Sequence, residues 1–185
     1  MESKEVGTNR TWDINRSMKI QKTELDGVLL ITPPVMHEDF RGTNTEVYND
    51  AIYRENGIDY NWVLDSISTS RRHVLRGLHG DSHTTKLITC LHGSFYFVVV
   101  NNDPTHPQYR QWESFTLSDK NRLQVLVPPK FGNGHLVMTE SVVFSYKLNA
   151  YYDRASQFTI KWNDPEFNIW WPIRRPILSE RDSAG

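Results

Sequence analysis

Short runs of β-branched and aromatic residues recur along the chain and are separated by Pro, Gly, Asn and Asp. This pattern predicts antiparallel strands and is typical of a β-sandwich or barrel. The run "SFYFVVV" is apolar on both faces, which indicates a strand enclosed within the core. Helical periodicity is confined to "NTEVYNDAIYRENG", residues 44–57, which ends at a glycine as helices commonly do. We therefore predict an all-β domain with one or a few short helices, and with strands within residues 27–34, 60–70, 73–80, 86–93, 94–103, 111–119, 122–129, 134–140 and 141–152.

The two-residue period of a strand indicates which polar side chains share a face. Asn133 and His135 lie two apart in "FGNGHLV" and should point the same way. Phe144, Tyr146 and Leu148 should share a face of another strand, which places the tyrosine among apolar neighbours.

Arg76 and His79 present a difficulty, since residues three apart face opposite sides of a regular strand. Both belong to "VLRGLHGDSH", where several ionisable residues interrupt an otherwise apolar pattern. Burying such groups is costly unless they are paired. We predict a β-bulge at Gly77, because bulges re-aim side chains and occur beside active sites.

Length and composition narrow the possible classes of protein. A chain of 185 residues fits one domain and needs no disulfide to hold its core, and it contains a single cysteine, Cys90. A net charge of −1 argues against a nucleic-acid or membrane-surface partner, and no apolar run approaches a membrane span. We expect a cytoplasmic protein, with a polar, flexible arm over residues 1–18 and a single domain over residues 19–185.

One histidine, one lysine, one tyrosine and one late aspartate on or beside these strands suit proton transfer next to a ketone. Histidine side chains have an ordinary pKa near 6.5 and serve as bases at neutral pH. A cationic donor would stabilise the enolate oxygen, and a tyrosine on the other face could return the proton and so invert the carbon. A carboxylate behind the histidine would fix its tautomer. This chemistry needs no metal or cofactor.

Each of these residues also has a purely structural interpretation. A histidine on a strand is most often held by hydrogen bonds, and Lys86 at the start of a strand resembles a solvated edge residue. Tyr146 fits a core tyrosine with its hydroxyl at the rim. Asp164 in "WNDP" has the position of a turn residue before proline. The pattern of residues does not by itself choose between these interpretations.

Several blocks together resemble the nucleotide-sugar 3,5-epimerase family: "VLRGLHG", "KLITCLHGSFYFVVVN", "LVPPKFGNGHLVM", "FSYKLNAYY" and "IKWNDPEFNIWWPIRRPILSERD". They occur in the family's order with similar gaps, from about residue 39 to Asp182. The resemblance implies a cupin jelly roll, a homodimer, no metal and no cofactor. It implies an enzyme that epimerises a nucleotide-linked 4-keto sugar at carbon 3, carbon 5 or both, for deoxysugar or heptose biosynthesis.

The resemblance also assigns roles. The histidine of "RGLH" makes His79 the base, "WNDP" makes Asp164 its carboxylate partner, and the "YK" strand makes Tyr146 the acid. Arg76 and Lys86 are expected to hold the sugar oxygens and phosphate.

The block "DFRGTNTE" is expected to lie toward the nucleotide. Its Arg41 matches a family arginine that often reaches across the dimer, and Glu46 closes the same block. "RGTNTE" lacks the paired aromatic residues of the family's "RGFFAE", and Ser66 stands where Asn is common. These differences favour a changed substrate, and the chain looks closer to epimerases of GDP-linked keto-heptoses than to those of dTDP sugars.

The pocket strand departs from the family as well. "GNGHLV" replaces "AHGFLV", so Asn133 stands at a position that is normally histidine and His135 at one that is normally phenylalanine. We expect both residues to contact the substrate, and the sequence does not decide which replaces the usual pocket histidine.

Other functions stay open at this stage. A cupin can be a metal-dependent enzyme, but His79 and His83 are four apart and no glutamate follows in the strand, unlike the usual cupin ligand set. A non-catalytic nucleotide-sugar-binding relative, a single-carbon 3-epimerase and a keto-sugar isomerase are the remaining alternatives.

Overall fold

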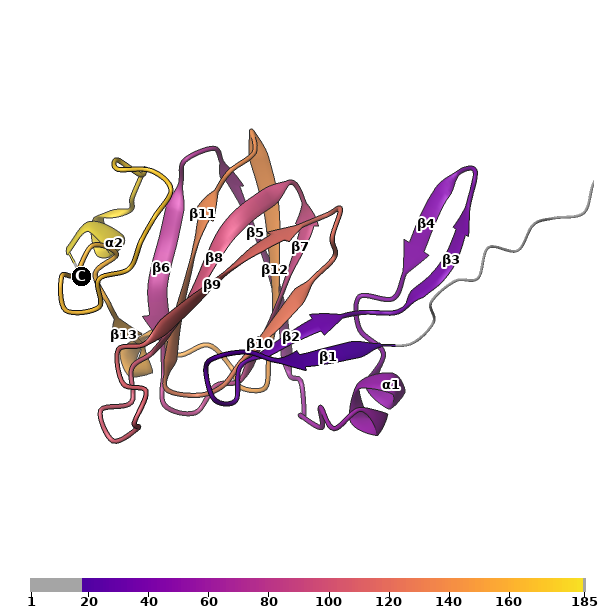
Figure 1. Cartoon of the computed structure of the whole chain (residues 1–185), viewed down its shortest axis with the longest axis horizontal. Coiled ribbons are helices and arrows are strands. Elements are labelled where there is room, and N and C mark those ends of the chain that lie inside the picture. The colour runs from indigo at the N-terminus through magenta and orange to yellow at the C-terminus, as the bar shows by residue number, and fades with distance from the viewer. Residues whose placement is uncertain (1–17, 185) are drawn as a thin grey trace, which may run out of the picture.

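A computed structural model describes residues 18–184 and consists mainly of two antiparallel sheets that face each other (Figure 1). The six-stranded sheet has the order β1-β2-β10-β7-β12-β5, and the five-stranded sheet has the order β13-β6-β11-β8-β9. This arrangement is a jelly roll, as predicted. The strands of the two sheets are β1 (Lys19–Lys22), β2 (Leu29–Thr32), β5 (Leu64–Arg71), β6 (Leu75–Gly80), β7 (Lys86–His92), β8 (Ser94–Asn101), β9 (Trp112–Ser118), β10 (Gln124–Val127), β11 (Phe131–Val137), β12 (Ser141–Leu148) and β13 (Phe158–Thr159).

A two-stranded hairpin of β3 (Val35–Asp39) and β4 (Gly42–Thr45) projects from the body of the molecule (Figure 1). The sequence had suggested a helix over residues 44–57, but helix α1 is shorter and spans Asp50–Glu55. The Asn49 side chain accepts a hydrogen bond from the Ile52 amide and fixes the start of α1, while residues 42–45 pair with β3 instead. The helix prediction was therefore right in its second half and wrong in its first.

Two layers of core explain how these strands pack. Between the sheets lies an aromatic and aliphatic core that includes Phe95, Phe97 and Phe144. The outer face of the five-stranded sheet carries a second core, where Leu75 and Leu136 pack with residues that follow β12. The chain after β12 therefore returns across this sheet and includes the short helices η1 (Arg154–Ser156) and α2 (Glu180–Ala184).

The predicted bulge in β6 is present. Asn133 of β11 pairs with His79 and His135 pairs with Arg76, so two steps along β11 match three steps along β6. Gly77 sits in the bulge with a φ of +114°, and a Cβ there would come within 2.6 Å of the Asn133 carbonyl oxygen. Only glycine fits this backbone, which brings Arg76 and His79 to the same side of the sheet.

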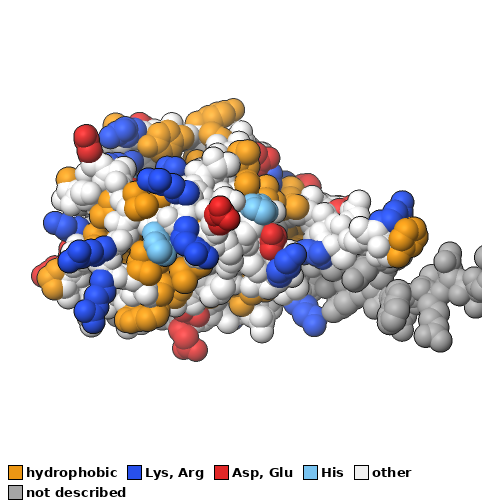
Figure 2. Space-filling view, turned by 90° about the horizontal axis from the view of Figure 1, so that it is seen from above, with side chains coloured by type: hydrophobic (Ala, Val, Ile, Leu, Met, Phe, Trp, Pro, Cys, Tyr) orange, Lys and Arg blue, Asp and Glu red, His pale blue; other side chains and the backbone are white. Residues whose placement is uncertain are grey.

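Residues 1–17, on which most of the predicted N-terminal arm falls, lie outside the described residues. Among residues 18–184, no helix is long and apolar enough to cross a membrane. Lys and Arg side chains on the face in Figure 2 are interspersed with acidic and apolar ones, in keeping with the small net charge.

Candidate active site

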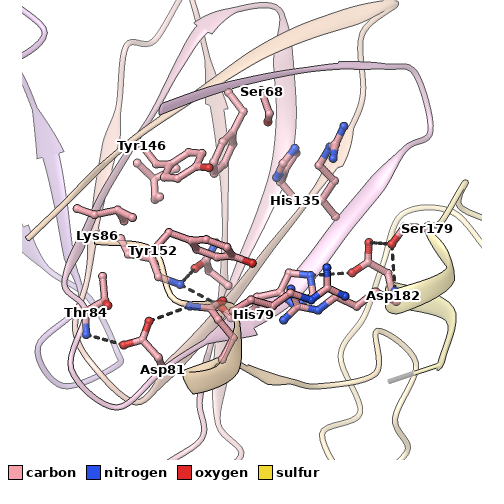
Figure 3. A pocket seen from close by; sticks show the side chains of 18 of the residues that line it. Ser68, His79, Asp81, Thr84, Lys86, His135, Tyr146, Tyr152, Ser179 and Asp182 are labelled. Carbon is pink, nitrogen blue, oxygen red and sulfur yellow. Dashed lines mark hydrogen bonds and ion pairs between the residues drawn. The ribbon is translucent and has the colours of Figure 1, made fainter. Parts of the chain in front are cut away.

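A cavity of about 660 Å³ opens between the two sheets (Figure 3). Strands β5, β7 and β12 supply one wall, strands β6 and β11 supply the facing wall, and the C-terminal segment closes one side. The lining residues are Ser68, Arg76, His79, Asp81, Thr84, Lys86, Ile88, Asn133, His135, Phe144, Tyr146, Leu148, Tyr152, Arg154, Gln157, Ser179, Glu180, Arg181 and Asp182.

His79 is held from behind by Asp182. Its Nε2 lies 2.7 Å from Asp182 Oδ1, and the Ser179 hydroxyl donates to the other carboxylate oxygen over 2.8 Å (Figure 3). Burial would raise the pKa of Asp182, but hydrogen bonds from His79 and Ser179 hold it below its ordinary value. Asp182 is therefore ionised at neutral pH and fixes the tautomer that carries hydrogen on Nε2.

This geometry leaves His79 Nδ1 as the nitrogen that carries a lone pair. Nδ1 lies 3.3 Å from Thr159 Oγ1, and that oxygen accepts a 3.1 Å hydrogen bond from Arg181 Nε. The imidazole is partly exposed on the pocket side. An oriented histidine with a carboxylate behind it and a ring partly open to a cavity is the arrangement that a general base requires.

The prediction that Asp164 partners His79 was wrong. Asp164 lies in the turn after β13, where its Oδ1 accepts the Glu166 amide over 2.9 Å and its carbonyl accepts the Asn168 amide. It does not line the pocket. Asp164 therefore has the structural role of a turn residue before proline, and the carboxylate at the histidine comes from α2.

Lys86 extends into the cavity from the start of β7, although it is buried. Its Nζ donates to Asn133 Oδ1 over 2.8 Å and to the His79 carbonyl over 3.1 Å. Burial lowers the pKa of Lys86 to about 8, and the charge of Asp81 opposes the decrease. A desolvated ammonium with one hydrogen left for a ligand is a strong donor for a developing oxyanion.

Asp81 organises the loop after β6, and this role explains the polar residue in "HGDSH". Its Oδ1 accepts the amides of His83 and Thr84 at 3.0 and 2.6 Å, and its Oδ2 accepts Gln157 Nε2 at 2.9 Å. Burial acts to raise the pKa of Asp81, but these backbone hydrogen bonds and the charge of Lys86 keep it low. Asp81 thus anchors the loop and adds a negative charge near the lysine.

Arg76 and Tyr146 come from facing walls. Arg76 Nε donates to Ser70 Oγ over 2.8 Å, and its guanidinium remains accessible at the rim. Tyr146 is half-buried beside Phe144, and its hydroxyl bonds to no other residue of the described part of the chain. As predicted, Phe144, Tyr146 and Leu148 share the face that lines the cavity.

His135 is the most deeply buried histidine of the pocket, at 3% exposed. Its ring stacks on Phe144 with a centroid distance of 4.2 Å and an interplanar angle of 10°. Nε2 is sealed from solvent and has no hydrogen-bond partner among the described residues. Burial, with the nearby charge of Arg76, lowers the pKa of His135 to about 3, so the ring is neutral at pH 7. A buried polar atom left unpaired costs about 1–3 kcal/mol.

Three of the predicted substrate-binding residues do not line this cavity. Arg41 forms an ion pair with Asp39 at the exposed end of the β3–β4 hairpin. Glu46 accepts a 2.7 Å hydrogen bond from Asn49 at the start of α1. Ser66 lies on β5 beside Tyr146 of β12, two residues from the pocket-lining Ser68.

The residues that sequence reasoning missed come mainly from the C-terminal segment: Tyr152, Arg154, Gln157, Ser179, Arg181 and Asp182. The block "PILSERD" contained the signal for Asp182, but nothing in its pattern tied it to β6. No group of three or more His, Cys, Asp or Glu residues within residues 18–184 is arranged to hold a metal ion.

Comparisons with known proteins identify the family to which this chain belongs. The family described as dTDP-4-dehydrorhamnose 3,5-epimerase matches residues 22–185. The dTDP-4-dehydrorhamnose 3,5-epimerase of Methanothermobacter thermautotrophicus is 36% identical over 166 residues, which cover 87% of this chain and 89% of that protein.

Two crystal structures show the same fold. The dTDP-6-deoxy-D-glucose-3,5-epimerase of Legionella pneumophila, in complex with dTDP-4-keto-L-rhamnose, is 34% identical with a TM-score of 0.85, and 90% of each chain is covered. A 3'-monoepimerase of Streptomyces bikiniensis, in complex with dTDP-quinovose, is 25% identical with a TM-score of 0.82, and 88% of this chain and 84% of that chain are covered. This chain, with a histidine–aspartate pair and a tyrosine across one jelly-roll cavity, therefore belongs to the dTDP-4-dehydrorhamnose 3,5-epimerase family.

Proposed function

We propose that this protein epimerises a nucleotide-linked 4-keto sugar by removing and returning a proton at a carbon next to the ketone. The observation that carries the proposal is the placement of the Asp182-held His79 on β6 and of Tyr146 on β12, on facing walls of one cavity (Figure 3). The family relationship supports the same reaction.

In the first step, His79 Nδ1 accepts the proton from the carbon beside the carbonyl, and the C–H electrons form the enolate C=C bond. The carbonyl electrons move onto the sugar's carbonyl oxygen. The negative charge of Asp182, 2.7 Å from Nε2, stabilises the imidazolium that results. The base acts from the five-stranded wall.

The enolate oxygen requires a positive donor, and Lys86 is the group best placed to supply one. Lys86 Nζ donates two of its hydrogens to Asn133 and to the His79 carbonyl. The fold, and not the substrate, therefore sets the direction of the third N–H bond. Arg76, at the rim, suits the more solvated diphosphate. Lys86 thus supplies preorganised electrostatic stabilisation.

In the second step, the Tyr146 hydroxyl delivers a proton to the opposite face of the enolate carbon, which inverts the centre. The enolate C=C electrons form the new C–H bond, and the oxygen electrons re-form the carbonyl. Exchange with solvent then removes the proton that His79 gained and returns one to the Tyr146 phenolate. Tyr146 suits this role because its hydroxyl is accessible and is not engaged by another described residue. The reaction as written needs no redox cofactor or metal.

The test is hydrogen exchange in deuterated water with 4-keto-6-deoxy sugars linked to dTDP and to GDP. We expect deuterium at carbon 3, carbon 5 or both, and the number of positions separates single-carbon from two-carbon epimerisation. Absence of exchange with every sugar would contradict the proposal. An inert nucleotide-sugar-binding protein would bind these compounds without exchanging them.

Replacement of Tyr146 by Phe should separate exchange from inversion. The ring still packs on Phe144, so the fold should be retained, while only the proton donor is lost. We expect His79 to continue to exchange the substrate proton while inverted product falls by about a hundredfold or more. Mass spectrometry and NMR of the same reaction measure the two quantities. Equal loss of both would indicate that Tyr146 only binds substrate.

The nucleotide base is a separate prediction. Thr43 and Asn44 of the projecting hairpin stand where the family has paired aromatics, and both are exposed. Loss of stacking surface weakens pyrimidine binding. We therefore expect higher kcat/KM with the GDP-linked sugar than with its dTDP counterpart, although the names of the relatives specify dTDP. A tenfold preference for dTDP would contradict this prediction and leave the epimerase proposal intact.

The homodimer and the cytoplasmic location also stay predictions. In the isolated chain, Arg41 and the rest of the β3–β4 hairpin project away from the body that holds the cavity (Figure 1). A role for Arg41 in nucleotide binding therefore requires a second subunit, and sedimentation of the purified protein would establish whether one is present.

A further inference from the structure

Two pairs of exposed arginines meet at the end of the molecule where β5 turns into β6. They form a surface that we call the outer arginine patch: Arg71, Arg72, Arg174 and Arg175. The pairs are far apart in sequence, but Ile177 bridges Val74 in parallel and its amide donates to the His73 carbonyl over 2.8 Å. Because the two segments run in the same direction, the arginines that precede Ile177 lie beside those that precede Val74.

The charges of the outer arginine patch are not neutralised by ion pairs. Among the described side chains, no carboxylate pairs with any of the four arginines. Arg72 Nε donates instead to the Met138 carbonyl over 3.2 Å, a neutral acceptor that orients the guanidinium and leaves its charge uncompensated. Glu140 and Glu180 adjoin the patch along the chain, and two carboxylates do not balance four guanidinium groups. Arginines elsewhere in the chain do pair with carboxylates: Arg41 with Asp39, Arg54 with Asp50 and Arg110 with Glu166.

The outer arginine patch adjoins the rim of the cavity. Arg76 is exposed and lines the cavity, and its Nε donates over 2.8 Å to Ser70, the residue before Arg71. The segment that carries the other pair continues into α2, where Arg181 also lines the cavity and donates through Nε to Thr159 Oγ1 over 3.1 Å. Both cavity arginines thus bond to neutral oxygens as well. Uncompensated positive charge therefore extends from the outer surface to the cavity wall.

The diphosphate of a nucleotide-linked sugar is an anion, and the chain as a whole does not attract one, since its net charge is −1. Attraction of such a ligand depends on local charge. On the basis of the proposed function, we propose that the outer arginine patch steers the nucleoside diphosphate toward the cavity and speeds its capture. The four arginines do not line the cavity, so they act on the encounter and not on the bound complex.

Stopped-flow binding of N-methylanthraniloyl-labelled GDP and dTDP tests this without catalysis, because it measures the association and dissociation rate constants kon and koff. Arg174→Gln/Arg175→Gln removes two charges that form no hydrogen bond with another described residue. At an ionic strength of about 10 mM, where the Debye length is about 30 Å, we expect kon to fall by at least about threefold. At about 1 M, where the Debye length is about 3 Å, the variant and the wild type should converge. The koff value should change by less than about twofold throughout.

Lys19→Gln/Lys22→Gln is the matched control. Both lysines are exposed on β1, at the edge of the six-stranded sheet opposite to β5, and the change in net charge is the same. This variant should keep the wild-type kon. Arg174→Lys/Arg175→Lys should keep it as well, since steering depends on charge and not on the shape of the guanidinium.

Equal kon values for the arginine-to-glutamine variant and the wild type at low ionic strength would overturn the proposal. An equal fall in the lysine control would also overturn it, because net charge alone would then explain the effect. A fall that persists at high ionic strength would indicate a direct contact and not steering. If the patch has no effect while deuterium exchange of keto sugars persists, the proposed function stands and steering is wrong. If the patch steers both nucleotides and no sugar exchanges, steering is right and the epimerase proposal is wrong.

Discussion

His79→Asn should eliminate deuterium incorporation at the carbon beside the ketone, with a loss of about a thousandfold or more. Of the two histidines that line the described pocket, only His79 has an ionised carboxylate behind its ring and a partly exposed imidazole. His135 cannot substitute for it, because its neutral ring is a far weaker base. Single-turnover exchange at saturating sugar measures the effect.

The melting temperature and the nucleotide-sugar affinity of His79→Asn show whether this variant is folded. His79 is partly exposed and contributes little to the core, so the melting temperature should remain near that of the wild type. Nucleotide-sugar affinity should persist through Lys86 and Arg76. Exchange at the wild-type rate by a folded His79→Asn protein would refute the mechanism.

Asp182→Asn and Asp164→Asn form a matched pair, since they make the same chemical change at a carboxylate inside and outside the pocket. Asp182→Asn should lower kcat by about a hundredfold or more, because an amide neither stabilises the imidazolium nor enforces the tautomer. Asp164→Asn should retain nearly full activity and at most lose some stability, because its carboxylate caps a turn. Steady-state kinetics with thermal unfolding as the folding control would compare the two.

The reverse ranking, with Asp164→Asn the more damaging variant, would restore the original sequence-based assignment. A purely structural role for Asp182 would show as a parallel loss of melting temperature and activity. A role in orienting the base predicts loss of kcat with little change in KM or stability.

Local patterns predicted most of the sheet. Alternation along β5 and β12, and the apolar run of β8, were sufficient to place those strands, and Gly77 signalled the bulge that lets Arg76 and His79 share a cavity. These features depend on residues close together in the chain, where steric and hydrophobic periodicity act directly.

The partner of the base could not be found in this way. Asp182 is 103 residues from His79, and their contact depends on the path of the C-terminal segment across the five-stranded sheet. "WNDP" and "PILSERD" stand within one block, so the resemblance supplied two aspartates without distinguishing them. The β3–β4 hairpin could not be predicted from local patterns either. Its strand pairing overrides the weak helical pattern of residues 44–45.

The buried Lys86 ammonium has a thermodynamic consequence for the whole protein. Its pKa is lowered to about 8 in the folded state from an ordinary 10.5, so between these pH values the unfolded chain holds a proton that the folded chain has released. Unfolding then takes up protons, and this residue's contribution to stability increases with pH by an amount on the order of 3 kcal/mol. An anionic ligand that contacts Lys86 raises its pKa again, so ligand binding above pH 8 is coupled to proton uptake. Burial of this charge therefore lowers the stability of the fold at neutral pH, and an anionic ligand that contacts Lys86 offsets part of that cost.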